Sequence, residues 1–266
     1  MISRLDTRLA LLLALLSTLV CAATACKDKS PTTSSQELTV AAASDLTPAF
    51  AEIKREFESS HRIRVIFVFG STGMLTRQIE NGAPVDLFAS ANVSYIDQLE
   101  QKGLIIPGTK TIYARGRITL WTPNDTNLRL ENIADLARPE VTRVAIANPD
   151  HAPYGLAARQ ALESAGVWER VKPKLVYGDN IRQTLQYAET GNVEVAIVAL
   201  SLSMQSNGRW SLIPEELHQP LDQGLAIMKS TKNEQAARAF AAFMGGPQGR
   251  AIMQKYGFSF PATKSD

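Results

Sequence analysis

The sequence predicts an α/β fold with mostly parallel sheets flanked by helices. Short apolar segments alternate with longer segments in which apolar residues recur at helical spacing. Strands that alternate with helices of this length are typical of α/β proteins. The 266 residues, 45% of them hydrophobic, are enough for one large domain or for two small lobes with their own cores.

Strands are predicted where short runs of β-branched, aliphatic and aromatic residues occur between turn residues. The segment Arg64–Phe69, for example, is β-branched and aromatic and is followed by Gly-Ser-Thr-Gly at residues 70–73. The strands expected on these grounds are 38–43, 64–69, 85–89, 118–121, 144–146, 175–176, 195–198 and 225–228.

Helices are predicted in the segments between these strands. Leu46, Phe50 and Phe57 fall on one face of a helix. Pro48 suits the first turn of that helix, where its missing N–H would have no partner. The expected helices are 46–57, 74–80, 94–102, 130–136, 154–165, 181–190, 233–244 and 247–256.

The first 25 residues predict a secretory signal peptide. Arg4 and Arg8 are followed by a nearly uninterrupted run of Leu and Ala at residues 9–20, and the small residues 23–25 provide a cleavage site. The apolar run is shorter than the roughly 20 residues that a membrane-spanning helix needs. We therefore expect the protein to be exported to the periplasm or to another extracytoplasmic location.

Cys26 leaves two outcomes of cleavage open. Ala-Thr-Ala-Cys at residues 23–26 resembles a bacterial lipoprotein cleavage site, after which the cysteine carries lipid and the polar segment 26–36 tethers the domain to a membrane. Alternatively, cleavage follows Ala25 and no lipid is attached. Cys21 and Cys26 are the only cysteines, so no disulfide is expected in the body of the chain.

Charge and histidine spacing argue against two classes of function. The 28 Lys and Arg residues against 26 Asp and Glu leave a net charge of +2, which is not typical of a dedicated nucleic-acid-binding protein. His61, His151 and His218 match no metal-ligand spacing. We expect no cofactor and no directly coordinated metal ion.

Polar turns follow two consecutive predicted strands. Ser44-Asp45 follows the first strand, Gly70–Gly73 follows the second, and each turn opens a helix. In α/β folds, ligands collect beyond the carboxyl ends of the strands, where helix N-termini present free N–H groups. Small hydroxyl side chains add donors without formal charge, so the two turns together suit an oxyanion. Each turn alone is equally well explained as a helix cap.

Two turns in the second half, at residues 148–155 and 178–181, also open helices, and short motifs occur along the chain in a characteristic order. These motifs are Ala-Ala-Ala-Ser-Asp-Leu (41–46), Gly-Ser-Thr-Gly (70–73), Gly-Ala-Pro-Val-Asp-Leu-Phe-Ala-Ser-Ala (82–91), Ala-Pro-Tyr-Gly (152–155), Val-Ala-Leu-Ser (198–201) and Gly-Pro-Gln-Gly (246–249) ahead of Tyr-Gly-Phe (256–258). As a set, they resemble the molybdate-binding proteins of bacterial molybdate ABC importers over about residues 37–261.

The resemblance implies a two-lobed type II periplasmic-binding-protein fold, with the ligand in the cleft between two α/β lobes. Lobe 1 would comprise residues 37–115 and 223–266, and lobe 2 residues 116–222, joined by two crossing segments. The resemblance also implies a monomer that is not an enzyme. Such a protein captures molybdate or tungstate and delivers it to the membrane permease and ATPase subunits of an ABC importer.

Carried over by position, the oxyanion donors of the family fall on Ser44, Asp45, Thr72, Tyr154 and Ile181. Ser44 corresponds to a hydroxyl and N–H donor, Asp45 corresponds to a backbone donor, and Thr72 replaces the serine usual in the second turn. Tyr154 and Ile181 match main-chain N–H donors of the second lobe. The resemblance further implies that Gly155 lets the chain come close to the anion.

Hydrogen-bond donors without an acceptor carboxylate suit molybdate and tungstate, which are dianions at neutral pH. Sulfate meets the same description, whereas phosphate carries a proton at this pH and needs an acceptor. Asp45 is the only one of the predicted oxyanion-binding residues with a carboxylate, and we expect this carboxylate to turn away from the anion and to cap the following helix.

Ala199 lies where one branch of the family has an additional tyrosine hydroxyl, so the chain resembles the other branch. Arg77 and Arg182 are expected to be solvated.

Three other functions are also compatible with the sequence. The same scaffold could bind another oxyanion such as sulfate. An exported hydrolase could use Ser44 or Ser201 as nucleophile with His151 as base, although no positioned nucleophile stands out. A ligand sensor that signals to a membrane partner is the third.

Overall fold

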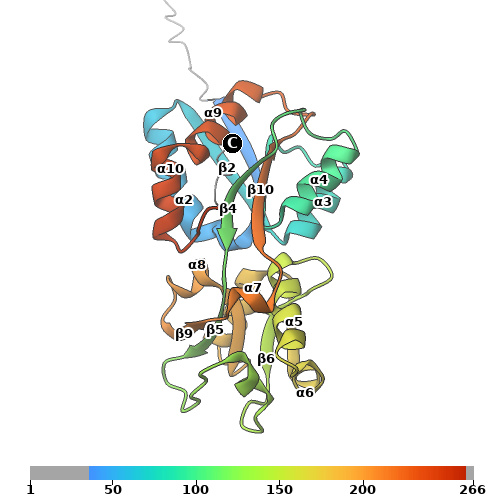
Figure 1. Cartoon of the computed structure of the whole chain (residues 1–266). Helices are drawn as coiled ribbons and strands as arrows, with labels where there is room; N and C mark the ends of the chain where they lie inside the picture. Colours follow the sequence, from blue (N-terminus) through green and yellow to red (C-terminus); the bar gives the residue numbers. More distant parts are fainter. Residues whose placement is uncertain (1–35, 262–266) are drawn as a thin grey trace, which may run out of the picture. The chain divides into compact units, whose positions relative to one another are not determined.

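Two five-stranded sheets organise the chain in the computed structural model, which describes residues 36–261 (Figure 1). The expected signal peptide at residues 1–25 and the expected tether at 26–36 lie outside the described residues, apart from Gln36, which begins the first strand. None of the helices in the described part of the chain is both long and apolar enough to cross a membrane.

The first sheet has the strand order β2-β1-β3-β10-β4. Its strands are β1 (Gln36–Ala43), β2 (Ile63–Gly70), β3 (Leu87–Ser90), β4 (Thr111–Gly116) and β10 (Leu221–Ile227). β1 is parallel to β2 and β3, whereas β10 is antiparallel to β3 and β4. Ala43 pairs with Gly70 in this register, so the polar turns after β1 and β2 begin side by side.

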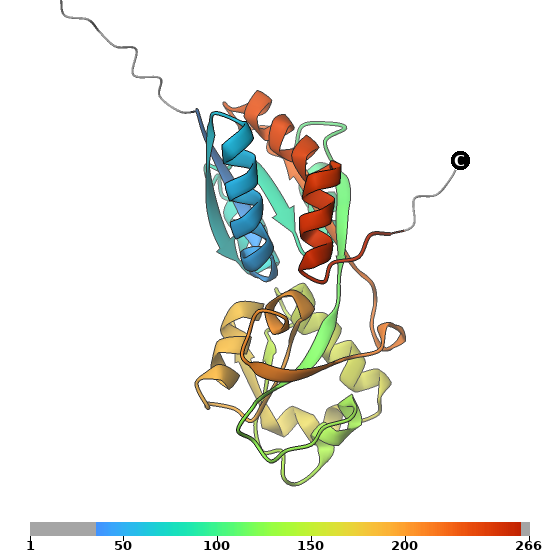
Figure 2. The same cartoon turned by 90° about the vertical axis from the view of Figure 1, so that its left-hand side faces the viewer.

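Helices cover the first sheet. They are α2 (Thr47–Ser60), α3 (Thr72–Glu80), α4 (Val93–Gln101), α9 (Glu234–Gly245) and α10 (Pro247–Lys255). Figure 1 shows α2 and α10 on one side of the sheet and α3 and α4 on the other, and Figure 2 shows α2 and α10 side by side. Phe50 and Phe57 of α2 are fully buried and pack edge-on against Phe240 of α9, which confirms the predicted apolar face of α2.

The second sheet has the strand order β7-β6-β8-β5-β9. Its strands are β5 (Ile118–Pro123), β6 (Val144–Ala147), β7 (Leu175–Gly178), β8 (Val195–Ala199) and β9 (Gly208–Leu212). β6 is parallel to β7 and β8, whereas β5 is antiparallel to β8 and β9. The helices α5 (Pro153–Ser164) and α7 (Ile181–Glu189) follow β6 and β7 and pack on this sheet.

Short helical segments connect these elements. They are η1 (Ser44–Leu46), η2 (Ile133–Ala137), α6 (Trp168–Val171), η3 (Lys172–Lys174), α8 (Leu200–Ser203) and η4 (Glu215–Leu217). In particular, η1 links β1 to α2, and α8 follows β8 directly. Both lie at the ends of strands where ligands of α/β folds collect.

The chain passes from one sheet to the other twice. Arg117 alone separates β4 from β5, and residues 213–220 separate β9 from β10. Arg117 Nη1 forms an ion pair with Glu215 Oε1 at 2.9 Å, which ties the two passages together. The two-lobed α/β fold is therefore confirmed, while the residue boundaries of the lobes stay a prediction.

The structure differs from the predicted elements in several places. One strand of each sheet runs against its neighbours, because β10 is antiparallel to β3 and β4 and β5 is antiparallel to β8 and β9. The other strands of each sheet share one direction, so the sheets are mostly parallel, as predicted. The sequence pattern does not predict the edge strands β4 and β9, in which polar side chains interrupt the apolar run. The predicted helix at 130–136 is instead the 3₁₀ helix η2, which begins with a capping box formed by Asn132 and Asp135.

Candidate functional site

The five residues predicted to hold an oxyanion lie around one pocket. They are Ser44 and Asp45 of η1, Thr72 of α3, Tyr154 of α5 and Ile181 of α7. The remaining lining residues are small: Ala43, Gly70, Ser71, Ala91, Ala152 and Pro153. About 190 Å³ of space lies between the lining atoms, including the opening to solvent. The structure thus brings the five residues together, and their role as ligands stays a prediction.

Three helices begin at the pocket with unpaired backbone donors. The N–H groups of Thr72, Tyr154 and Ile181 each lie in the first turn of a helix and have no backbone acceptor among residues 36–261. The side chain of Asn180 caps α7 by accepting from the two N–H groups after that of Ile181, at 3.0 and 3.1 Å. Free N–H groups at a helix N-terminus, together with the helix dipole, favour an anion at this position.

Two hydroxyl groups add further donors. Ser44 Oγ makes no hydrogen bond with any described residue, although Ser44 is buried. Thr72 Oγ1 accepts the N–H of Ala91 at 3.1 Å, which orients the hydroxyl while its own hydrogen remains available. Ser71 instead donates its hydroxyl hydrogen to the carbonyl oxygen of His151 at 2.6 Å. Of the two neighbouring hydroxyls, the one free to bind a ligand is therefore that of Thr72.

Asp45 does not cap a helix, contrary to the prediction. Neither η1 nor α2 has a side-chain cap. The carboxylate is fully buried, and its Oδ2 accepts hydrogen bonds from the Tyr154 hydroxyl at 2.9 Å and from Gln223 Nε2 at 2.6 Å. Oδ1 has no hydrogen-bond partner within the part of the chain that the structure describes. The partners come from α5 and β10, and their hydrogen bonds replace the expected local cap.

Burial favours the protonated form of the Asp45 carboxyl. It raises the pKa of the Asp45 carboxyl from 3.8 to about 6, although the hydrogen bonds from Gln223 and Tyr154 oppose the rise. Burial and the nearby Asp45 charge also raise the pKa of Tyr154 well above its ordinary value, so its hydroxyl remains a donor. The same causes raise the pKa of Tyr113, which donates to Gln223 Oε1 at 2.7 Å.

Hydrogen bonds connect the two lobes at the pocket. The carbonyl oxygen of His151 accepts the N–H of Gly73 at 2.8 Å as well as the hydroxyl of Ser71. Ser201 Oγ donates to the carbonyl oxygen of Asp45 at 2.8 Å. The structure is therefore a closed arrangement, in which donors from both lobes line the same pocket.

Gly155 has a different role from the predicted one. A Cβ at this position would come within 2.0 Å of the carbonyl oxygen of Ala147, at the end of β6. Glycine therefore allows α5 to begin tightly against that strand. Close packing of helix and strand therefore requires glycine here, and Gly155 is not among the residues that line the pocket.

The Ser–His pairs of the hydrolase hypothesis do not form among the described residues. His151 Nδ1 lies 2.9 Å from Ser71 Oγ, whereas Ser201 donates its hydroxyl hydrogen to a backbone carbonyl. Burial lowers the pKa of His151.

No group of three or more His, Cys, Asp or Glu side chains within residues 36–261 is placed to hold a metal ion. Arg77 and Arg182 are exposed, as predicted.

Gln223 and Tyr113 take part in the site without a clear signal in the sequence. Both lie inside strands, β10 and β4, and their side chains are almost completely buried. A glutamine that follows Asp222 and precedes the apolar end of the strand is the only available hint, because buried polar side chains need partners.

Comparisons with known proteins agree with this geometry. A family model described as bacterial extracellular solute-binding protein matches residues 38–259. The molybdate-binding protein ModA of Rhodobacter capsulatus is 33% identical over 224 residues, which cover 84% of this chain and 88% of that protein.

Two solved structures have a similar fold. The periplasmic molybdate-binding protein of Azotobacter vinelandii superposes with a TM-score of 0.78 at 28% identity, covering 84% of this chain and 99% of that chain. The sulfate-binding protein SubI of Mycobacterium tuberculosis H37Rv superposes with a TM-score of 0.72 at 17% identity, covering 84% and 86% of the two chains. The second similarity shows the fold alone.

Proposed function

Because the chain belongs to the bacterial extracellular solute-binding protein family, we propose that it captures molybdate, or the similar anion tungstate, and delivers it to an ABC importer. The partners of the protein would be the membrane permease and the ATPase subunits of that importer. The protein itself performs no chemistry on the anion. The names of the relatives in Rhodobacter capsulatus and Azotobacter vinelandii support this choice of cargo.

The observation that carries the proposal is the set of uncharged donors around the pocket. The hydroxyls of Ser44 and Thr72 and the N–H groups of Thr72, Tyr154 and Ile181 have no protein acceptor among the described residues. Each hydrogen bond to a charged group contributes roughly 1.5–3 kcal/mol, so several such bonds can hold a dianion without a positively charged side chain.

The division of these donors between two lobes supports a route for release. Ser44 and Thr72 belong to elements of the first sheet, whereas Tyr154 and Ile181 begin helices of the second. Opening of the lobes about the two passages would remove about half of the donors from the anion in one step. A positively charged arginine side chain, by contrast, could remain bound to the anion when the lobes open.

We also propose where the protein works and in what form. Residues 1–25 would direct export, and the mature protein would act as a monomer in the periplasm or at another extracytoplasmic location. Cys26 is the residue that would carry lipid if cleavage follows the lipoprotein route. Mass spectrometry of the exported protein distinguishes a lipid-modified N-terminal cysteine from an unmodified one.

Isothermal titration of the exported protein with molybdate, tungstate, sulfate and phosphate tests the proposed cargo. We expect one-to-one binding of molybdate and tungstate, with an affinity about tenfold or more above that for sulfate. The metal–oxygen bonds of molybdate and tungstate are longer than the bonds of sulfate, so sulfate would make longer and weaker hydrogen bonds in a site of this size. Absence of binding at tens of micromolar molybdate would contradict the proposal. Tighter binding of sulfate than of molybdate would assign a different cargo to the same fold.

A further inference from the structure

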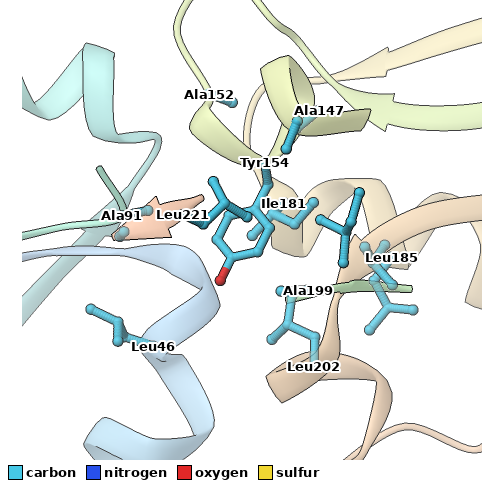
Figure 3. Packing of buried hydrophobic residues seen from close by; sticks show 14 of the residues in the cluster. Leu46, Ala91, Ala147, Ala152, Tyr154, Ile181, Leu185, Ala199, Leu202 and Leu221 are labelled. Carbon is cyan, nitrogen blue, oxygen red and sulfur yellow. The ribbon is translucent and has the colours of Figure 1, made fainter. Parts of the chain in front are cut away.

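The side chain of Tyr154 reaches from one lobe into the other. Its helix, α5, packs on the second sheet, but its hydroxyl donates to Asp45 Oδ2 at 2.9 Å, in the turn that follows β1 of the first sheet. In Figure 3 the hydroxyl oxygen of Tyr154 points toward the segment that carries Leu46. The side chain is buried, so water does not compete for this hydrogen bond.

The first lobe holds the acceptor in place. Gln223 of β10 donates from Nε2 to the same Oδ2 of Asp45 at 2.6 Å, and Tyr113 of β4 donates to Gln223 Oε1 at 2.7 Å. These bonds orient the Gln223 amide, and through it the carboxylate, using residues of the first lobe alone. Ser201 of the second lobe adds a bond to the carbonyl oxygen of Asp45 at 2.8 Å. Asp45 is therefore held from both lobes.

The passage between the lobes leaves room for the Tyr154 hydroxyl. Gly116 is the last residue of β4, directly before the passage to β5. A Cβ at Gly116 would come within 2.1 Å of the Tyr154 hydroxyl oxygen and 3.2 Å of Gln223 Nε2. Gly116 is not among the glycines with positive φ, so space rather than backbone conformation requires glycine here.

Tyr154 thus serves both the pocket and the contact between the lobes. Its backbone N–H has no acceptor among the described residues and lies at the pocket, and its hydroxyl binds the residue next to Ser44. We infer that the Tyr154 hydroxyl, seated on Asp45 and Gln223 beside Gly116, is an interlobe latch that sets how long the bound anion stays. This inference rests on the proposed binding function and adds to it a positioning role for the side chain.

Tyr154→Phe tests the latch because it keeps the ring and the backbone N–H and removes only the hydroxyl. A matched control is Tyr177→Phe, which removes the hydroxyl of an exposed tyrosine on β7. Dissociation is measured by chasing radiolabelled molybdate with unlabelled molybdate from the exported protein. We expect Tyr154→Phe to dissociate about tenfold faster or more, with an association rate within about twofold of wild type. Tyr177→Phe is expected to match wild type.

A double-mutant cycle adds a readout that a merely structural role would not produce. Gly116→Ala is expected to speed dissociation in the wild-type background, because the added Cβ displaces the Tyr154 hydroxyl. It is expected to change dissociation much less in the Tyr154→Phe background, where the hydroxyl is absent. Equal effects of Gly116→Ala in the two backgrounds would overturn the latch.

The two proposals fail in different ways. A wild-type protein that does not bind molybdate overturns the proposed function. A wild-type protein that binds molybdate, while Tyr154→Phe releases it at the wild-type rate, overturns the latch alone. The melting temperature of anion-free Tyr154→Phe is expected to stay within a few degrees of wild type, so a faster release is assigned to the closed form and not to loss of folded protein.

Discussion

Lowering the pH from 8 to 5 is expected to tighten molybdate binding about tenfold, because the buried carboxylate of Asp45 lies at the pocket. In the closed structure this carboxylate is buried against the Tyr154 hydroxyl, and we expect opening of the lobes to expose it to water. Burial disfavours the charged form, so closure is coupled to uptake of a proton.

The magnitude follows from the pKa of Asp45 in two states. The pKa is about 6 in the closed structure, and we take the ordinary value of 3.8 for an open form in which water reaches the carboxylate. The closed form holds more protons between these values, so affinity is highest at low pH, falls as the pH rises through 6 and is level above it. With these two pKa values, the affinity for molybdate is about tenfold higher at pH 5 than at pH 8. A bound dianion would raise the pKa of Asp45 further, so this ratio is a lower bound.

Other groups near Asp45 titrate outside this range or can be tested separately. Tyr154 and Tyr113 face the carboxylate, and the pKa of each is raised well above its ordinary value. His151, which bonds to Ser71 at the pocket, has a pKa lowered from 6.5 by burial and gains charge as the pH falls. The variant His151→Gln measures that contribution.

Isothermal titration with molybdate at pH 5, 6, 7 and 8 compares wild type with Asp45→Asn. The variant keeps an acceptor for the Tyr154 hydroxyl and removes the charge. It is expected to bind about tenfold tighter or more than wild type at pH 8 and to lose the part of the pH dependence that Asp45 causes. If the Asp45 carboxylate were instead exposed to solvent, Asp45→Asn would leave the affinity for molybdate nearly unchanged. Equal wild-type affinity at pH 5 and pH 8, or an unchanged pH dependence in Asp45→Asn, would show that protonation of Asp45 is not coupled to binding of molybdate.

Further variants test the donors and the packing around them. Thr72→Ala is expected to weaken molybdate binding about tenfold or more, whereas Thr72→Ser keeps the hydroxyl and stays within about threefold in the same titration; equal losses in the two would contradict the assignment of the donor. Gly155→Ala is expected to lower the free energy of unfolding by about 1–3 kcal/mol, because its Cβ would collide with the carbonyl oxygen of Ala147, and an unchanged denaturation midpoint would rule this out. Phe240→Ala removes a ring that packs against Phe50 and Phe57, so a loss of about 3–5 kcal/mol is expected in chemical denaturation. Since Phe240 does not line the pocket, a changed molybdate affinity of the folded variant would count against this separation of core and site.

The sequence predicts much of the fold because the relevant signals are local. The apolar run of β2 and the helical spacing of Phe50 and Phe57 in α2 depend only on neighbouring residues. The edge strands β4 and β9 escape prediction because pairing on one side only permits polar side chains within them. The antiparallel direction of β10 and β5 depends on where the chain crosses between lobes, which local patterns do not encode.

The candidate site could also be predicted from the sequence only where its features depend on neighbouring residues. The turns at Ser44, Thr72 and Ile181 could be located because each follows a strand and opens a helix. The orientation of Asp45 could not, because its partners Tyr154 and Gln223 are 109 and 178 positions away in the sequence. A helix cap within the same turn was the only local partner available to the prediction. The structure instead brings together three elements at this carboxylate.

A crystal structure of the exported protein grown with tungstate would show whether the pocket holds an oxyanion, since tungsten is located independently by its anomalous scattering. We expect one tungsten atom in the pocket, with its oxygen atoms within hydrogen-bond distance of Ser44 Oγ, Thr72 Oγ1 and the N–H groups of Tyr154 and Ile181. Tungsten bound elsewhere, or a tungstate oxygen in contact with the carboxylate of Asp45, would rule out an uncharged donor site at this pocket.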